Sequence, residues 1–329
     1  MVTTVYELGV PSGGTAFIGA ANREDLLDVV TVISPTDTPM FTMCPKTKIS
    51  NVQTEWITDK LDQAGSNAVD EGSDPTFNTA QLRARLLNYA QISREAYNVS
   101  DTQRAVNPAG IRDELRYQMT KALKQWKRDV EHDIINGNTA SAASVRCSRG
   151  IAQWLGGFSS ITASATGSNT ANNIQEDDLN AMLQRIWVSG GEPDYILCTP
   201  TQKRHISSNF SGSANSRRTH PISDNTLVNV VDFYDSDFGD VKILPHRWFT
   251  TVTANPGIDV MRTTFALQAD KWVIGFLRPP RNIPLAKTGS SEKAMVEGEW
   301  TLVCLHPSAN AYVKLHASAT AFTDDFPLN

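Results

Sequence analysis

The sequence lacks the features that would place it in several common classes of protein. No apolar run approaches the roughly 20 residues of a membrane-spanning helix, and residues 1–22 lack the basic segment and apolar core of a signal peptide. No HExxH, paired CxxC, P-loop, GxSxG or strand-linked GxGxxG motif is present. We therefore expect no membrane partner, no metal, no cofactor, no catalytic residues and no enzymatic activity.

The sequence also has few cysteines and no excess of positive charge. The chain of 329 residues has a formal net charge of −5, which gives no general affinity for nucleic acid or anionic membranes. Its four cysteines lie far apart in the sequence, at Cys44, Cys147, Cys198 and Cys304. This spacing favours buried or half-buried thiols in a reducing compartment.

The clearest positive feature is a helix predicted over Gly110–Gly137. Its apolar residues recur at helical spacing and form one stripe: Ile111, Leu115, Met119, Leu123 or Ala122, Trp126, Val130 and Ile134. Asn107 and Pro108 are predicted to open the helix and Gly137 to end it. At about 1.5 Å per residue the helix is about 40 Å long, long enough to be the spine of an extended molecule.

The segments before this helix predict an arm and a ribbon. Residues 1 to about 20 are rich in Gly, Ser and Thr and read as an extended arm. Residues 47–100 predict a strand, a long acidic turn-rich tip and a returning strand. Because a two-stranded ribbon is only marginally stable alone, we favour one that lies on a neighbouring subunit. A solvated loop in a monomer is the alternative.

The segments after the helix predict a lobe and a closing sheet. Residues 174–189 form an amphipathic helix lined by Leu179, Met182, Leu183, Ile186 and Trp187. A short buried strand follows at Tyr195–Cys198, and Pro200 opens another helix. This order predicts a compact α/β lobe, after which residues 258–320 are rich in strands.

The order of arm, hairpin, long helix, α/β lobe and closing sheet resembles the HK97-type major capsid protein of tailed bacteriophages. The residues look like one branch, the SU10-type major capsid proteins. The resemblance is carried, from about Ala20 to Val313, by NREDLLDVVTVISPTDTPMF, TEWITDKLDQAGSNAVDEG, LRYQMTKALKQWKRDVEHDIING, GGEPDYILCTPTQKRHIS, VVDFYDSDFGDVKILPHRWF and LAKTGSSEKAMVEGEWTLVCLHPSANAYV.

The resemblance implies an α+β fold of the HK97 type with five segments. They are an N-terminal arm (1–48), an E-loop hairpin (49–100), a P-domain with the spine helix (101–145), an A-domain or axial lobe (146–257), and a return to the P-domain sheet and C-terminus (258–329). It implies a capsid protein that self-assembles into hexamers and pentamers of an icosahedral phage head enclosing double-stranded DNA.

The resemblance also implies partners and a location. The partners are other copies of the chain, a portal, a scaffold or decoration protein, and non-specifically packaged DNA. The location is the virion, with host cytoplasm during assembly. Because the arm before the family-like region is short, we expect no long self-scaffold. Some relatives cross-link a Lys to an Asn; Lys60 lies in the hairpin, but no Asn and Glu match that pattern, so we expect no cross-link.

Three other functions remain open at this point. An encapsulin-like protein cage would share the fold and enclose cargo enzyme in place of DNA. A cytosolic enzyme would assemble its site from scattered residues. A tail or decoration component would lack a long spine helix preceded by an arm.

The candidate site residues are interface residues. In the ribbon they are Trp56, Asp59, Asp62 and Glu71, and on the spine they are Arg112, Arg116, Lys124, Lys127 and Arg128. One hypothesis pairs the spine cations with the ribbon acids of a neighbouring subunit. The alternative pairs them within the helix, at helical spacing, with Asp113, Glu114, Asp129 and Glu131.

Overall fold

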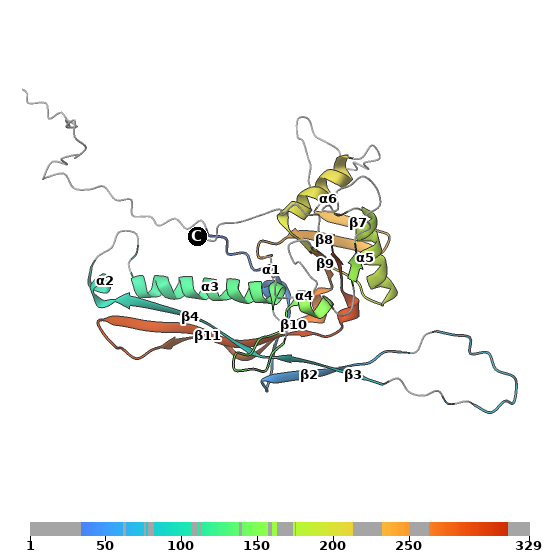
Figure 1. Cartoon of the computed structure of the whole chain (residues 1–329), viewed down its shortest axis with the longest axis horizontal. Helices are drawn as coiled ribbons and strands as arrows, with labels where there is room; N and C mark the ends of the chain where they lie inside the picture. The colour runs from blue at the N-terminus through green and yellow to red at the C-terminus, as the bar shows by residue number, and fades with distance from the viewer. Residues whose placement is uncertain are drawn as a thin grey trace, which may run out of the picture.

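The protein is an extended α+β chain built from two sheets, a two-stranded ribbon and one long helix (Figure 1). The computed structural model describes residues 34–61, 64–75, 77, 82–106, 111, 113–137, 140–156, 160–162, 174, 176–212, 232–249 and 263–314. Much of the predicted arm, residues 1–33, and the predicted interface residues Asp62 and Arg112 lie outside these ranges.

The long helix α3 covers one face of the four-stranded sheet (Figure 1). The helix runs Glu114–Asn136, and the sheet has the order β1 (Lys46–Lys48), β10 (Trp272–Pro284), β11 (Ser291–Cys304) and β4 (Gln91–Ser100). β10, β11 and β4 are antiparallel, and β1 joins the edge of β10 in parallel. The long strands give the helix a platform along its length.

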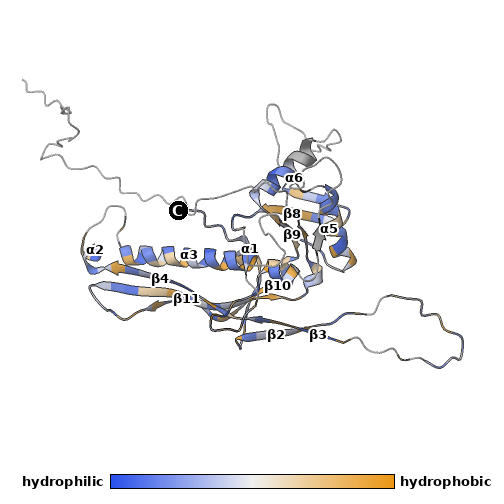
Figure 2. Cartoon of the chain, viewed as in Figure 1, coloured by the Kyte–Doolittle hydropathy of each residue, from blue (hydrophilic) through white to orange (hydrophobic). Residues whose placement is uncertain are grey.

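The predicted apolar stripe of α3 is confirmed, and its start is corrected. Ala122, Trp126, Val130 and Ile134 are buried, whereas Leu123 is 38% exposed, so Ala122 is the core residue of the two. Hydrophilic and hydrophobic residues mix along the helix, as an amphipathic element requires (Figure 2). The helix begins at Glu114, where the side chain of Asp113 accepts a hydrogen bond from the backbone of Arg116. Asn107 and Pro108, the predicted opening, lie before it and outside the described residues.

The centre of α3 packs on the sheet through tryptophan. The ring of Trp126 lies over Gly298 of β11, where an added Cβ would stand 2.7 Å from the ring. The indole nitrogen of Trp126 donates to the backbone oxygen of Ser93, and that of Trp300 donates to the Ser93 hydroxyl, both at 2.9 Å. A glycine is needed at position 298 because the helix approaches the strand closely there.

The α/β lobe contains a six-stranded sheet with two helices on one face. The strand order is β5 (Ser160–Thr162), β12 (Ala311–Lys314), β9 (Thr263–Leu267), β6 (Tyr195–Cys198), β8 (Gly239–Pro245) and β7 (Phe233–Ser236). The helices are α5 (Glu176–Val188) and α6 (Pro200–Gly212). They share one apolar cluster with Ile196, Val241 and Ile243. The predicted helix, strand, helix order is confirmed, except that Trp187 is 59% exposed and does not line the core.

The strand-rich C-terminal region divides between the two sheets. β9 and β12 lie in the lobe, whereas β10 and β11 form the centre of the four-stranded sheet. Two short 3-10 helices, Ala269–Lys271 and Pro307–Ala309, lie at these crossings between sheets. The lobe sheet and the four-stranded sheet are therefore joined by two short connections, from β9 to β10 and from β11 to β12, as well as by packing.

The ribbon consists of β2 (Gln53–Thr58) and β3 (Ala84–Tyr89), paired antiparallel from Gln53 opposite Tyr89 to Thr58 opposite Ala84. Figure 1 shows it projecting away from both sheets. β4, the last part of the range expected to form the hairpin, pairs with β11 instead. We call residues 53–89 the ribbon from here on.

The described residues also form three short α-helices: α1 (Pro39–Met43), α2 (Asp101–Ala105) and α4 (Ile151–Gly156). Among the described residues no helix is both long and apolar enough to span a membrane. All four cysteines are free, with Cys147 half-buried and the other three buried, as their spacing predicted. Burial raises the pKa of Cys44 and of Cys198 to about 12, so these thiols are poor nucleophiles.

Replacing Trp126 by alanine tests the packing of the spine. We expect Trp126→Ala to lower the free energy of unfolding by about 3–5 kcal/mol, because a fully buried indole is lost and a cavity remains over Gly298. The matched control is Leu123→Ala on the same helix, with an expected loss of about 1 kcal/mol or less. Urea unfolding of the unassembled subunit measures both, and equal losses would contradict the packing described here.

Candidate functional site: assembly surfaces

A buried carboxylate on the spine joins three segments that are far apart in the sequence. The Glu131 side chain accepts hydrogen bonds from the backbone nitrogens of Met40, at 2.8 Å, and Phe41, at 2.7 Å. Its Oε1 also lies 2.7 Å from Nε2 of His246, and both side chains are fully buried. Thr38, the residue before α1, makes no side-chain cap, so Glu131 caps this helix in its place.

The segment around His246 completes this junction. The backbone nitrogen of Trp248 donates to Nδ1 of His246, which places the ring hydrogen on Nε2, where it donates to Glu131. Trp248 donates through its indole nitrogen to the backbone oxygen of Asp37, and its own backbone oxygen accepts from Asn136. The junction thus fixes residues 37–41 against both the spine and the lobe.

Aromatic contacts reinforce the junction. Phe41 packs edge-on against Trp126, with ring centroids 6.2 Å apart. The guanidinium of Arg128 lies 4.6 Å from the ring centroid of Trp248, a cation–π contact within the chain. Arg128, a predicted interface residue, therefore already has a partner in its own subunit.

The base of the ribbon is anchored to the core by Trp56. Its indole nitrogen donates to the backbone oxygen of Cys304 at 2.9 Å, and its ring lies against Trp154 at 5.4 Å between centroids. Asn88 in β3 is fully buried and donates to the backbone oxygen of Leu302 at 2.6 Å. Trp56, predicted as an interface residue, is thus placed where it fixes the root of the ribbon.

Beyond its base, the described residues of the ribbon are mostly exposed and include large apolar side chains. Five large apolar residues are 63–95% exposed along it: Ile57, Leu61, Val69, Phe77 and Leu82. Monomeric proteins rarely leave so many apolar side chains uncovered in one region. This exposure is the strongest sign in the described residues of a surface that another chain covers.

The ribbon acids have different surroundings. Asp59 forms an ion pair with Arg83 across the ribbon at 2.9 Å, and that hydrogen bond lowers the pKa of the Asp59 carboxyl. Glu71 is exposed beside Gly72, whose φ of +79° makes the turn at the tip. Asp59 and Glu71 are both accessible to a neighbouring chain, but only Asp59 has a charged partner of its own.

Three of the predicted spine cations are exposed and have no ion-pair partner among the described residues. Arg116, Lys124 and Lys127 point to solvent. The four acids proposed as partners within the helix bind other groups: Asp113 caps the helix, Glu114 accepts from Gln118, Asp129 accepts from Gln125, and Glu131 lies in the junction. Within the described part of α3, no ion pair therefore joins Arg116, Lys124 or Lys127 to these acids.

A charged network lies on the sheet face opposite α3. Arg278 bonds Glu297 and Glu299, each at 2.9 Å, and Arg146 bonds Glu299 at 2.8 Å. Glu299 is almost fully buried, so the two guanidinium groups compensate a charge removed from water. Sequence spacing gives no signal for this network because its members come from three distant segments.

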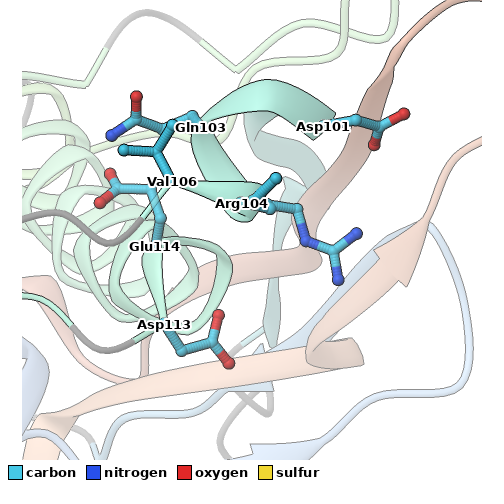
Figure 3. A pocket seen from close by; sticks show the side chains of 7 residues that line it. Asp101, Gln103, Arg104, Val106, Asp113 and Glu114 are labelled. Atoms are coloured by element: carbon cyan, nitrogen blue, oxygen red, sulfur yellow. The ribbon is translucent and has the colours of Figure 1, made fainter.

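A hollow of about 570 Å³ lies between α2 and the start of α3 (Figure 3). Its lining residues are Asp101, Gln103, Arg104, Ala105, Val106, Asp113 and Glu114. Most of its charged groups serve the fold: Arg104 pairs with Glu292, and Asp101 pairs with Lys287, which lowers the pKa of that carboxyl. No described group of three or more His, Cys, Asp or Glu residues could hold a metal ion. The features of the described residues that stand out are therefore the junction, the exposed ribbon and the exposed spine cations.

A sequence model of the SU10 major capsid protein family matches residues 9–316. The chain belongs to this family. It is similar to the major capsid protein of Escherichia phage Phieco32, with 26% identity over 89% of the chain and 94% of the relative. As a major capsid protein of the SU10 family it is a structural component of the virion capsid, as the resemblance implied.

The fold of this capsid protein is that of HK97-like capsids. A structure from Gordonia phage Cozz is similar to it, with a TM-score of 0.63 and 15% sequence identity. The match covers 96% of this chain and 100% of the Cozz chain. The SrpI encapsulin of Synechococcus elongatus PCC 7942 is also similar, with a TM-score of 0.53 and 14% sequence identity. That match covers 91% of this chain and 96% of the encapsulin chain. The likeness to encapsulin extends to the fold alone, so the encapsulin-like alternative is the weaker one.

Replacing Glu131 by glutamine tests the junction. The amide presents one oxygen where the carboxylate presents two, so one donor is left buried without a partner. We expect Glu131→Gln to lower the free energy of unfolding by about 2–4 kcal/mol. The control is Glu114→Gln, which keeps an oxygen for Gln118 and should change stability by about 0.5 kcal/mol. Chemical denaturation measures the free energy of unfolding of both variants. An unchanged value for Glu131→Gln would show that the junction does not stabilise the fold.

Proposed function

We propose that this capsid protein assembles into hexamers and pentamers of an icosahedral head that encloses double-stranded DNA, with the ribbon of each subunit lying on a neighbour. The observation that carries this proposal is the exposed apolar ribbon. Family membership supports shell formation, and the ribbon supplies an arm with which subunits can interlock.

The chemistry of the ribbon supports contact with another copy of the chain. Two paired strands have no core of their own, so the side chains of Leu61, Phe77 and Leu82 gain burial only against another molecule. Asp59 and Glu71 lie at the polar rim of such a contact, where charges set orientation more than affinity. Trp56 acts indirectly, since it fixes the direction in which the ribbon leaves its own subunit.

Assembly also involves components that the chain itself does not contain. We propose a portal and a scaffold or decoration protein as partners, and host cytoplasm as the place of assembly. The role is structural and not enzymatic. Buried thiols with raised pKa values and charged groups engaged in the fold support this view.

Electron microscopy of the purified protein, with light scattering on the same sample, tests the proposed function. We expect shells or rings with five and six subunits. DNA inside native particles would favour the phage head over a cargo cage. Subunits that remain monomeric even with their scaffold and portal would overturn the proposal.

Polar substitutions on the ribbon test its role. We expect Phe77→Ser combined with Leu82→Ser to reduce shell yield at least tenfold while the thermal midpoint of the unassembled subunit stays unchanged, because both side chains are more than 90% exposed. The control is Val145→Ser, a substitution at a residue that is 75% exposed outside the ribbon. Normal shell yield from the double variant would show that the ribbon does not hold subunits together.

A further inference from the structure

A stripe of exposed cations, without ion-pair partners in the described part of the chain, runs along α3. We define the spine stripe as Arg116, Lys121, Lys124 and Lys127, all of which are exposed. With 100° between successive helical residues, these four positions fall within less than half of the helix circumference. From Arg116 to Lys127 the stripe extends for about 17 Å, at about 1.5 Å per residue.

The charge of the spine stripe is not compensated by the rest of the described chain. None of the four residues forms an ion pair with a described residue, and no acid is exposed on the helix between Arg116 and Lys127. The protein as a whole carries a net charge of −5. Four adjacent positive charges in an acidic protein repel one another at low salt, so they favour a negatively charged partner.

The spine stripe lacks the apolar side chains that would be needed to bury the exposed apolar residues of the ribbon. The other exposed residues between Arg116 and Lys127 are Thr120, which is polar, and Leu123, which is only 38% exposed at the border. A contact that buried the five exposed apolar residues of the ribbon would need apolar or aromatic side chains opposite them. Charge alone would match the ribbon acids, but most of the exposed ribbon surface would remain uncovered.

We infer that the spine stripe binds the phosphate backbone of double-stranded DNA. This inference rests on the proposed function, in which the assembled shell encloses DNA. Lysine and arginine on a rigid helix, with a threonine hydroxyl between them, form the kind of surface that contacts phosphates without reading base sequence. α3 holds the four side chains in fixed positions because its opposite face is packed on the sheet through Trp126 and Val130.

The inference assigns the two candidate surfaces to different partners. The ribbon contacts a second copy of the chain, and the spine stripe contacts the enclosed polyanion. This arrangement replaces the hypothesis that spine cations pair with the ribbon acids of a neighbour. The two assignments predict opposite phenotypes for a variant that loses the stripe.

Neutralising the stripe without reversing its charge gives the sharpest test. The variant is Arg116→Gln, Lys124→Gln and Lys127→Gln together, and the matched control is Lys48→Gln, Arg204→Gln and Arg281→Gln, three exposed cations on other elements. Both triple variants change the net charge equally. Binding of unassembled subunits to a short random-sequence DNA duplex is measured from 50 mM salt upwards.

We expect the stripe variant to bind the duplex more weakly. The slope of log affinity against log salt should become shallower by about 2–3, since about 0.9 of a counterion is released per phosphate contact. The control variant should keep the slope of the unsubstituted protein. Equal slopes for both variants, or no binding by the unsubstituted protein at 50 mM salt, would overturn the inference.

The same variants are then expressed in infected cells in place of the unsubstituted protein. We expect the stripe variant to form shells in normal number, and a smaller share of those shells should contain DNA than in the control. A loss of shells from subunits that remain folded would overturn the inference and show that the stripe meets a neighbouring subunit. Failure of the unsubstituted protein to form shells would instead count against the proposed function, so the two failures are distinguishable.

Discussion

The buried Glu131 carboxylate is the constraint on which the rest of the structure depends. A carboxylate without water must receive hydrogen bonds, and here the donors come from residues 40 and 41, which precede the first sheet, and from His246, which follows β8. Because these donors lie about a hundred residues from Glu131 on either side, satisfying one side chain fixes α1, the spine and the lobe relative to one another. The position of the ribbon follows, since it leaves from the adjoining core at Trp56 and Asn88.

The buried core of the molecule is separate from the ribbon and the spine stripe. Tryptophans 126, 154, 272 and 300 are fully buried around the spine and the four-stranded sheet. The ribbon in contrast has apolar side chains that the described residues leave exposed, and the spine stripe has charges that form no ion pair with a described residue. Under the proposed function this separation leaves the ribbon available to another subunit and the spine stripe available to DNA, because surfaces satisfied within the monomer contribute little to association.

Part of this architecture was predictable from the sequence, because the signal was local. The apolar period of α3, the turn-rich interruption between β2 and β3, and the helix, strand, helix order of the lobe each depend on neighbouring residues. Predictions that depended on contacts between distant residues were less successful. β4 was assigned to the hairpin although it pairs with β11, and Trp187 was assigned to the core although its indole is mostly exposed.

The sequence by itself determined the elements, their order and, through the resemblance, the capsid family. Hydrophobic periodicity and turn residues act over a few positions, and the quoted segments cover nearly the whole chain. Only the tertiary structure decided what the charged residues do. Glu131 and Lys124 are both charged residues of one helix, yet one is buried in the junction and the other faces solvent. The difference arises because α1 and residues 246–249 cover the C-terminal half of α3, and no local pattern in the helix encodes which distant segments pack over it.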